Sequence, residues 1–429
     1  LVGSEMCIRD STVTGRNDWA SQLANSPSSS FFYPSVGLSW VPTSTWDLGE
    51  ALSYLKIRGS IASVGMPFPR HLTIPTYEYD ATNRVWKDKT HYPIGDLKPE
   101  RTTTYEVGLD ARLWQRISLS ASWYQADTKN QTFDPSLPPS SSYTTIYLQT
   151  GHVRNTGVEL SAGYDNQWRD FRWATNFTYS WNRNEIIELA ANAVNPVTGE
   201  PLNLNKLDIK GLGKAKYILK EGGTLGDLYT TSDLRFNDNG YIEVDKNGNL
   251  LLTDEGDDIY LGSVFPDHNL AWRNDFSWKG INLGVLFTAR IGGICYSATQ
   301  ANMDLYGVSE ASAAARDAGG VWINGRELVD AQKWYQAIGS QSGLPQYYTY
   351  SATNIRLQEL SLGYTLPAKW FRDKMRMTVS FVGRNLWMIY CKAPFDPEAV
   401  ASTGLNYQGI DYFMMPSLRS LGFNVKFQF

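Results

Sequence analysis

The sequence has 429 residues, of which 42% are hydrophobic, 13% aromatic and 19% charged, and its formal net charge is −4. Because it has no net positive charge to attract phosphates, we expect no nucleic-acid partner. No run approaches the ~18–20 apolar residues that a membrane-spanning helix needs, although strands that alternate apolar and polar residues are compatible with the mean hydropathy of −0.34.

The first ten residues, LVGSEMCIRD, share no pattern with the rest of the chain and read like translated adapter sequence. We therefore expect residues 1–10 to be non-native and residues 11–429 to fold as one unit. The segment also lacks the basic start and apolar stretch of a signal peptide, so for an exported protein we expect the natural N-terminus upstream. Cys7, Cys295 and Cys391 are too few and too scattered to predict a disulfide framework or a metal site.

Period-two alternation of apolar and polar residues is the main signal along the chain. Over 105–113 the odd positions are apolar, and the even positions include Glu106 and Arg112. The pattern resumes over 117–123 after a tight turn at 114–115, which predicts a β-hairpin. The same alternation predicts strands over 158–164, 171–181, 270–278, 281–291, 360–366, 375–381 and 421–429, with a poorly defined strand near 12–19 and about twelve strands in all.

The two faces of these strands differ in chemistry. One face carries charged and small polar residues, as a hydrated interior would: Glu106, Arg112, Arg172, Arg290, Lys426 and many Ser and Asn. The other face is apolar and ends in rings that favour the interface between lipid and water: Trp123, Tyr179, Trp181 and Trp278. A soluble sandwich also alternates, so this pattern alone leaves a secreted all-β protein possible.

The connections alternate between short and long. The short ones fall near 42–51, 114–115, 166–170, 279–280 and 367–374, and the long ones over 65–101, 126–156, 182–268, 292–354 and 384–416. This order predicts an all-β fold, a transmembrane antiparallel up-and-down β-barrel with short periplasmic turns and long extracellular loops. Within the loops, Asn239-Gly240 and Asn247-Gly248 predict a small ribbon, and 311–318 and 327–338 predict short helices.

Over roughly residues 31–429 the chain resembles the SusC/RagA-like TonB-linked (TonB-dependent) outer-membrane receptors of Bacteroidetes. The resemblance rests on segments in a fixed order: FFYPSVGLSW at 31–40, LSYLKIRGSIASVG at 52–65, DLKPERTTTYEVGLD at 96–110, VRNTGVELSAGY at 153–164, IRLQELSLGYTLP at 355–367, GRNLW at 383–387, DPE at 396–398 and the final LGFNVKFQF.

The resemblance implies a barrel of about 22 strands in the intact protein, plugged by an N-terminal domain, in the outer membrane. It also implies energised uptake of oligosaccharides or peptides through contact with TonB, together with a SusD-like surface lipoprotein. Residues 11–429 would then be the C-terminal portion of the barrel, partial at about 12 of the 22 strands, with the plug domain absent from this chain. We expect the segment that contacts TonB to lie in the missing N-terminal part.

No catalytic or cofactor-binding constellation is readable, so we expect no enzyme. The four histidines, His71, His91, His152 and His268, show no metal-binding spacing. Asp396-Pro397-Glu398 is interpreted as a Pro-fixed turn with solvated carboxylates.

A weak calcium candidate begins at Asp245. Oxygen-bearing side chains follow at alternate positions, but Leu250 and Gly256 stand where a calcium loop needs Gly and Glu, so we favour a solvated turn. The candidate ligands are Asp245, Asn247, Asn249 and Asp254.

Two further groups are candidates for function. Aromatic rings in the long loops could stack on sugar, with packing or interfacial anchoring as the alternative: Tyr77, Tyr79, Trp86, Trp322, Tyr347 and Tyr348. By the family resemblance, Phe427 and Phe429 on the last strand would form the signal read by the outer-membrane assembly machinery.

Two other functions remain open. A passive porin or adhesin barrel would lack energy coupling. A secreted all-β carbohydrate-binding protein or enzyme would, if it were hydrolytic, need paired carboxylates about 5–10 Å apart, and no pair is indicated.

Overall fold

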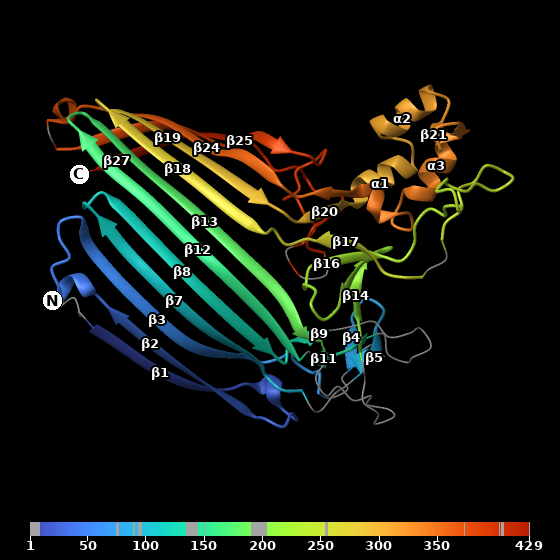
Figure 1. The fold of residues 1–429 in the computed structure, drawn as a ribbon, viewed down its shortest axis with the longest axis horizontal. Coiled ribbons are helices and arrows are strands. Elements are labelled where there is room, and N and C mark those ends of the chain that lie inside the picture. Colours follow the sequence, from blue (N-terminus) through green and yellow to red (C-terminus); the bar gives the residue numbers. More distant parts are fainter. Residues whose placement is uncertain are drawn as a thin grey trace.

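The structure is a computed structural model that describes residues 9–73, 77–88, 91–92, 97–133, 145–149, 151–189, 204–253, 256–372, 374–402, 404 and 407–428. Its main element is one antiparallel sheet of twelve long strands, each paired with the next long strand along the chain (Figure 1). The strands are β1 (Arg9–Trp19), β2 (Ser30–Trp40), β3 (Leu52–Met66), β7 (Glu100–Leu113), β8 (Ile117–Lys129), β12 (His152–Trp168), β13 (Phe171–Glu188), β18 (His268–Trp278), β19 (Ile281–Ile291), β24 (Asn354–Thr365), β25 (Arg376–Cys391) and β27 (Ser420–Gln428).

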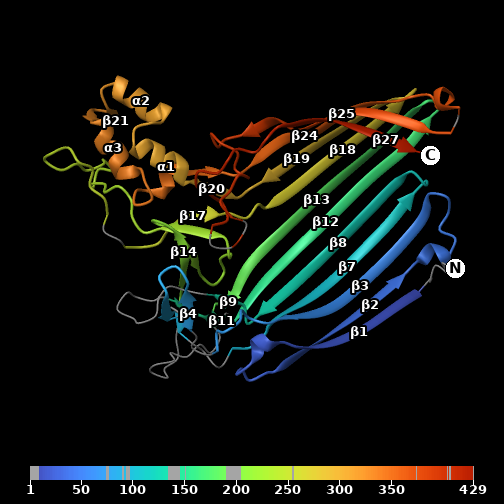
Figure 2. The same cartoon turned by 180° about the vertical axis from the view of Figure 1, so that it is seen from behind.

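This order confirms the predicted up-and-down topology and the count of twelve. The sheet is curved, and its edge strands β1 and β27 are not hydrogen-bonded to each other (Figures 1 and 2). The first strand begins at Arg9, within the segment 1–10, whose non-native origin stays a prediction. β12 and β13 are the longest strands, with 17 and 18 residues.

The short turns gather at the end of the sheet near the two termini (Figure 1). At 279–280 the turn has only two residues, and both Lys279 (φ 47°) and Gly280 (φ 90°) adopt positive φ. Such two-residue turns match the twist of the flanking strands. The register therefore continues directly from Trp278 to Ile281, which are paired.

The long loops fold at the opposite end into small elements, which we call the cap (Figure 2). The cap contains a four-stranded sheet, a three-stranded sheet, hairpins and three α-helices. Its strands are β4 (Tyr77–Asp80), β5 (Val85–Asp88), β6 (His91–Tyr92), β9 (Thr132–Phe133), β10 (Thr145–Ile146), β11 (Leu148–Gln149), β14 (Leu207–Leu212), β15 (Ala215–Leu219), β16 (Asp227–Thr230), β17 (Ile259–Ser263), β20 (Ile294–Ser297), β21 (Val321–Ile323), β22 (Glu327–Val329), β23 (Thr349–Ser351) and β26 (Ile410–Asp411).

One predicted helix begins later in the structure than the sequence indicated. The predicted helix over 327–338 is instead β22 followed by α3 (Ala331–Ile338), because Asp330 caps the helix by accepting hydrogen bonds from the backbone of Gln332 and Lys333. The helix predicted over 311–318 is confirmed as α2 (Glu310–Asp317), and α1 (Ala298–Leu305) was not predicted. The 3₁₀ helices are η1 (Ser21–Leu23), η2 (Pro42–Ser44), η3 (Pro345–Tyr348) and η4 (Ala368–Phe371).

The apolar face of the sheet has no protein layer against it within the described chain. Phe423 is 80% exposed, Val425 47% and Ile281 44%. The main buried core lies in the cap instead. Among the described residues no helix is long and apolar enough to cross a membrane. A large apolar surface left open on a folded sheet indicates that something other than this chain covers it.

Candidate functional site

The register lines up residues of like chemistry across the sheet. One row, on the apolar face, runs through ten strands: Trp40, Ile57, Leu109, Ala121, Leu160, Tyr179, Leu270, Ala289, Ile355 and Tyr390. The adjacent row, on the polar face, is Ser39, Arg58, Gly108, Ser122, Glu159, Ser180, Asn269, Arg290, Asn354 and Cys391. The predicted division into an apolar and a hydrated face is confirmed.

Ion pairs cross the polar face from strand to strand. Arg273 Nε lies 2.8 Å from Asp275, and its guanidinium also approaches Glu359 at 3.5 Å. Glu359 in turn accepts from Arg384 Nε at 3.1 Å. The arginines in this chain of charges are about half exposed or more, so each pair stabilises the sheet by about 1 kcal/mol or less. The network keeps this face hydrated and polar.

A buried ion pair ties the last long loop to the wall. Arg356, only 4% exposed, donates to both carboxylate oxygens of Asp396 at 3.0 and 3.3 Å and approaches Glu398 at 3.3 Å. Asn354 joins by donating to Glu398 at 3.1 Å, and Ser417 donates to Asp396. The prediction of solvated carboxylates at Asp396 was therefore wrong, because the ring of donors replaces water.

The charge of Asp396 is set by this environment. Burial alone would raise the pKa of Asp396, but hydrogen bonds from Arg356 and Ser417 outweigh it and hold the pKa below its usual range. Sequence reasoning did not identify Arg356, because its partner lies 40 residues away and no local pattern links the two.

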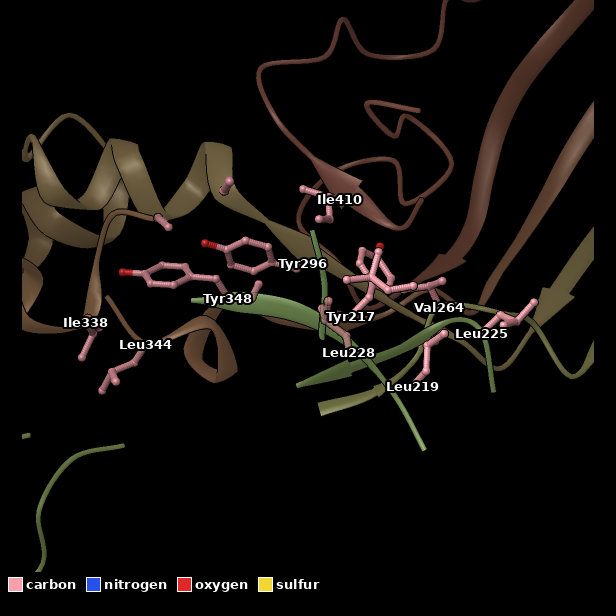
Figure 3. Close-up of a cluster of buried hydrophobic side chains, with 14 of the residues drawn as sticks. Tyr217, Leu219, Leu225, Leu228, Val264, Tyr296, Ile338, Leu344, Tyr348 and Ile410 are labelled. Atoms are coloured by element: carbon pink, nitrogen blue, oxygen red, sulfur yellow. The ribbon is translucent and has the colours of Figure 1, made fainter. Parts of the chain in front are cut away.

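The cap has its own hydrophobic core, drawn from four of the long loops, and Figure 3 shows its central residues. Phe133 comes from the loop over 126–156, and the other three loops supply most of the remainder. Tyr217 and Leu228 come from the four-stranded sheet, Tyr296 from β20, Leu344 from the segment before η3, and Ile410 from β26. All five are nearly or completely buried. Because burying a large apolar side chain contributes about 1.5–3 kcal/mol, the loops hold one another in a defined shape.

Polar contacts add to this packing. The side-chain amide of Asn324 donates to the carbonyl of Ile242 at 2.9 Å and accepts from its N–H at 2.8 Å. Lys333 on α3 donates to the carbonyl of Asn247. Arg326 lies 4.6 Å from the ring centroid of Tyr241, a cation–π contact. The ribbon predicted from the two Asn-Gly pairs is confirmed by bridges within 234–252, and it is docked on the helical part of the cap.

Asp245, the first calcium candidate, has a hydrogen-bonding role in its own turn. Its carboxylate accepts from the backbone of Asn247 and Asn249 at 2.8 Å each and from the Asn249 side chain at 2.8 Å. In the preceding turn of the ribbon the amide oxygen of Asn237 accepts in the same way from Asn239 and Tyr241. Asp254 lies outside the described residues, and the described ones contain no group of three metal-binding side chains. Calcium binding stays a prediction.

The predicted ligand-stacking rings occupy different environments. On the β4–β5 hairpin, Tyr79 pairs with Trp86, their ring centroids 5.2 Å apart, and Tyr77 lies two residues from Tyr79 on the same face. These three rings are 67% (Tyr77), 49% (Tyr79) and 70% (Trp86) exposed. Hydrogen bonds from Asn83 and an ion pair with Lys87 fix Asp80 at the turn between the strands.

The other candidate rings lie elsewhere in the cap. Trp322 on β21 is exposed, and Tyr347 packs edge to face on Trp334. Tyr348 is only 3% exposed and belongs to the core, so protein already covers its ring, and burial raises its pKa. Of the roles considered for the six rings, ligand stacking, packing and interfacial anchoring, Tyr348 has the packing role.

The last strand and the cysteines complete the list of candidates. Phe427 pairs with Met377 on β25 and is half exposed, while Phe429 lies outside the described residues. Cys295 is a buried free thiol, whose pKa burial raises to about 12, and Cys391 is also free. A thiol so resistant to ionisation is a poor nucleophile at neutral pH.

A curved antiparallel sheet with an open apolar face, an ion-paired polar face, short turns at one end and a folded cap at the other defines the wall of an outer-membrane β-barrel. The chain belongs to the family described as TonB dependent receptor-like, beta-barrel, whose model matches residues 10–285. The predicted kinship with SusC/RagA-like receptors and the outer-membrane location are thereby confirmed.

Similar proteins agree with this assignment. The chain is 25% identical to TonB-dependent receptor P3 of Formosa agariphila over 97% of this chain and 44% of that protein. It is 21% identical to TonB-dependent receptor SusC of Bacteroides thetaiotaomicron over 78% of this chain and 32% of that protein. The fold matches the RagAB peptide importer in its closed-closed state with a TM-score of 0.70, at 20% identity, over 98% of this chain and 46% of that one. The chain thus spans less than half the length of these relatives.

Proposed function

We propose that this chain forms the later wall and the cap of an outer-membrane importer that takes up oligosaccharides or peptides with energy delivered through TonB. The observation that carries the proposal is the family match over 10–285 together with a polar, ion-paired face on the inside of the sheet. A nutrient can cross a barrel only along such a hydrated face, since the other face meets lipid. The likeness to the RagAB peptide importer supports peptides, and oligosaccharides are the other class that the family resemblance implies.

The cap is the part of the chain that would meet the outside partner. Four of its loops share one packed core at the far end from the short turns, which gives a SusD-like surface lipoprotein a defined surface to contact. The resemblance to SusC/RagA-like receptors implies such a partner, and the relatives named as TonB-dependent receptors support energy coupling through TonB.

Within the cap we assign the first contact with ligand to Tyr77, Tyr79 and Trp86. Their rings share one face of a stiff hairpin and are exposed, whereas Asp80 and Lys87 are paired with each other. Flat apolar rings suit the CH faces of sugars. Trp322 is exposed but lies apart from the hairpin on β21, Tyr347 is less exposed, and Tyr348 is buried.

Uptake by the source organism tests the proposal. The gene for the intact receptor is deleted and complemented, and entry of fluorescent oligosaccharides and oligopeptides is followed with and without a protonophore. Import that needs both the gene and the proton-motive force is expected. Entry that needs the gene but ignores the protonophore would instead support a passive porin.

The hairpin is tested with Trp86→Ala and Tyr79→Ala in the same strain. Both should weaken uptake of the accepted ligand several-fold. The matched control is Trp370→Ala, which removes a ring that is 69% exposed at the short-turn end of the barrel and should leave uptake unchanged. Equal uptake by all three variants would remove the hairpin from the ligand path.

We further propose that Phe427 and Phe429 mark the last strand for assembly, as the family resemblance implies. Phe429→Ala should lower the amount of receptor in the outer membrane. Phe423→Ala, which removes an exposed ring from the middle of the same strand, is the control.

A further inference from the structure

A small cavity of about 220 Å³ lies between the three helices of the cap. Asp304 on α1 and Ser312 on α2 form its buried floor. Tyr335 on α3 borders it, and the exposed side chains of Arg316 and Gln332 stand at its rim. The cavity belongs to none of the candidate sites identified from the sequence.

Asp304 is a buried carboxylate whose charge no described cation balances. It is 5% exposed. Oδ1 accepts from the side-chain amide of Gln300 at 3.0 Å and from the hydroxyl of Ser309, both neutral donors. The ion pairs formed by the described residues do not include Asp304, and the buried hydroxyl of Tyr348, which lies beside its carboxylate, is also a neutral group. The carboxylate therefore borders the cavity with only neutral hydrogen-bond donors among the described residues.

Such an arrangement is costly unless a cation completes it. Removing an ionised carboxylate from water without a paired cation is strongly unfavourable, and proteins normally pair or neutralise such groups. We infer that the cavity binds a primary ammonium group, which would donate to the carboxylate of Asp304 and balance its charge. The hydroxyl of Ser312 lies on the same floor, and the ring of Tyr335 at the wall can add a cation–π contact.

The donor set favours an ammonium over a metal ion. Among the described residues no three His, Cys, Asp or Glu side chains come together, here or elsewhere. One carboxylate and a few neutral oxygens are too few for Ca²⁺, which takes six to eight oxygen ligands. The cavity volume accommodates one amino-sugar ring or one amino-acid side chain, and both can carry an ammonium.

Arg316 restricts the rest of the ligand. Its guanidinium donates to the carbonyl of Gly307 at 2.8 Å and stays at the rim. A second positive charge on the ligand would be repelled there, whereas hydroxyls or a carboxylate would be accepted. The ligand class is thus a compact molecule or residue with one ammonium and a neutral or anionic remainder.

Calorimetric titration of the purified intact receptor tests the inference with two pairs of probes. Glucosamine is compared with N-acetylglucosamine, and Nα-acetyl-lysine amide with its Nε-acetylated form. At least one free amine should bind, and its acetylated partner, which has lost the charge, should bind at least tenfold more weakly. The pair that responds distinguishes an amino sugar from a peptide.

Asp304→Asn should abolish this binding, whereas Glu310→Gln, which neutralises an exposed carboxylate on α2 of the same cap, should leave it unchanged. Equal binding of free and acetylated probes, binding retained in Asp304→Asn, or no binding of either amine would overturn the inference. The probe comparison needs only the unmodified receptor, so it tests the inference even if Asp304→Asn fails to fold. It is also independent of uptake, and so of the proposed importer function.

Discussion

Arg356 on β24 and Asp396 in the last long loop, 40 residues apart, meet through two hydrogen bonds of 3.0 and 3.3 Å on the polar side of the barrel wall. Both side chains are almost fully buried, at 5% and 8% exposed. The pair therefore fixes the path of the loop that leads into β27. This contact therefore links the position of the cap to the start of the final strand.

Removing one partner of this pair should loosen the loop. Asp396→Asn leaves the buried Arg356 with only the more exposed carboxylate of Glu398, at 3.3 Å, as a described anionic partner. The loss should therefore approach the ~3–5 kcal/mol that breaking a buried ion pair costs. Urea unfolding of the detergent-purified receptor, combined with protease cleavage within 392–419, measures the effect. Arg384→Gln is the control, because Arg384 is 67% exposed in its pair with Glu359 and its loss should cost about 1 kcal/mol or less. Equal losses for the two variants would contradict a special role for Asp396.

The same pair predicts a pH dependence. Since the folded-state pKa of Asp396 is held below its usual range, its stabilisation is present above the unfolded pKa of about 3.9 and is lost as pH falls through the lower, folded value. Protease sensitivity of the loop should rise below about pH 4 in the wild-type receptor. Asp396→Asn should already be sensitive at neutral pH and change little on acidification. A wild-type loop that stays protected at pH 2 would argue against the pair.

Neighbouring positions on β12 should respond oppositely to charge. Leu160 is on the apolar face, and Ser161, whose hydroxyl donates to Asn176, is on the polar face. Leu160→Arg should destabilise the barrel by about 2–4 kcal/mol in lipid vesicles, the cost of arginine near the bilayer midplane. Ser161→Arg should change stability far less. The measurement is urea unfolding in vesicles, and similar losses at both sites would mean that the faces are not lipid and water.

Gly280 tests the two-residue turn. Its φ of 90° is disfavoured for residues with a Cβ, and a Cβ there would lie 2.9 Å from the carbonyl oxygen of Thr365. Gly280→Ala should therefore destabilise the β18–β19 hairpin by about 1 kcal/mol or more. Lys279→Gly, at φ 47°, provides the comparison, because glycine accepts that conformation, and should be nearly neutral. A neutral Gly280→Ala would show that the turn relaxes.

Substitution of Asp245 distinguishes a role in capping the turn from a role in calcium binding. Asn237 caps the equivalent turn with an amide, so Asp245→Asn should keep the ribbon folded. Thermal unfolding with calcium and with chelator should give the same midpoint for wild type and variant. A calcium-dependent rise in the midpoint that disappears in Asp245→Asn would restore the calcium hypothesis.

The strands of the wall could be predicted because the two faces of each strand meet different environments. The resulting alternation of apolar and polar residues is visible within a few consecutive positions of the sequence. The strand predicted over 281–291 coincides with β19. Strand ends were underestimated where the strands enter the cap. Val153 and Ile186 sit in the cap core, so the simple contrast between lipid and water no longer governs those positions.

The interior of the cap was beyond sequence reasoning for a different reason. Tyr217 and Ile410 share one core although they are far apart in the chain, and no period connects them. The same holds for Arg356, whose ion pair depends on a distant carboxylate. It also holds for Asp304, because the lack of a described cation beside it is seen only when its neighbours are known. The exposed rings of the β4–β5 hairpin were indicated by sequence, but their common face needed the register.

The shared core of the cap has a consequence for engineering. Side chains from 126–156, 182–268, 292–354 and 384–416 jointly exclude water, so none of these segments can be exchanged alone without leaving a void. A chimera that grafts all four from a relative onto these strands should assemble, whereas single-loop grafts should misfold. The loops that determine selectivity in such receptors would then change together rather than one at a time.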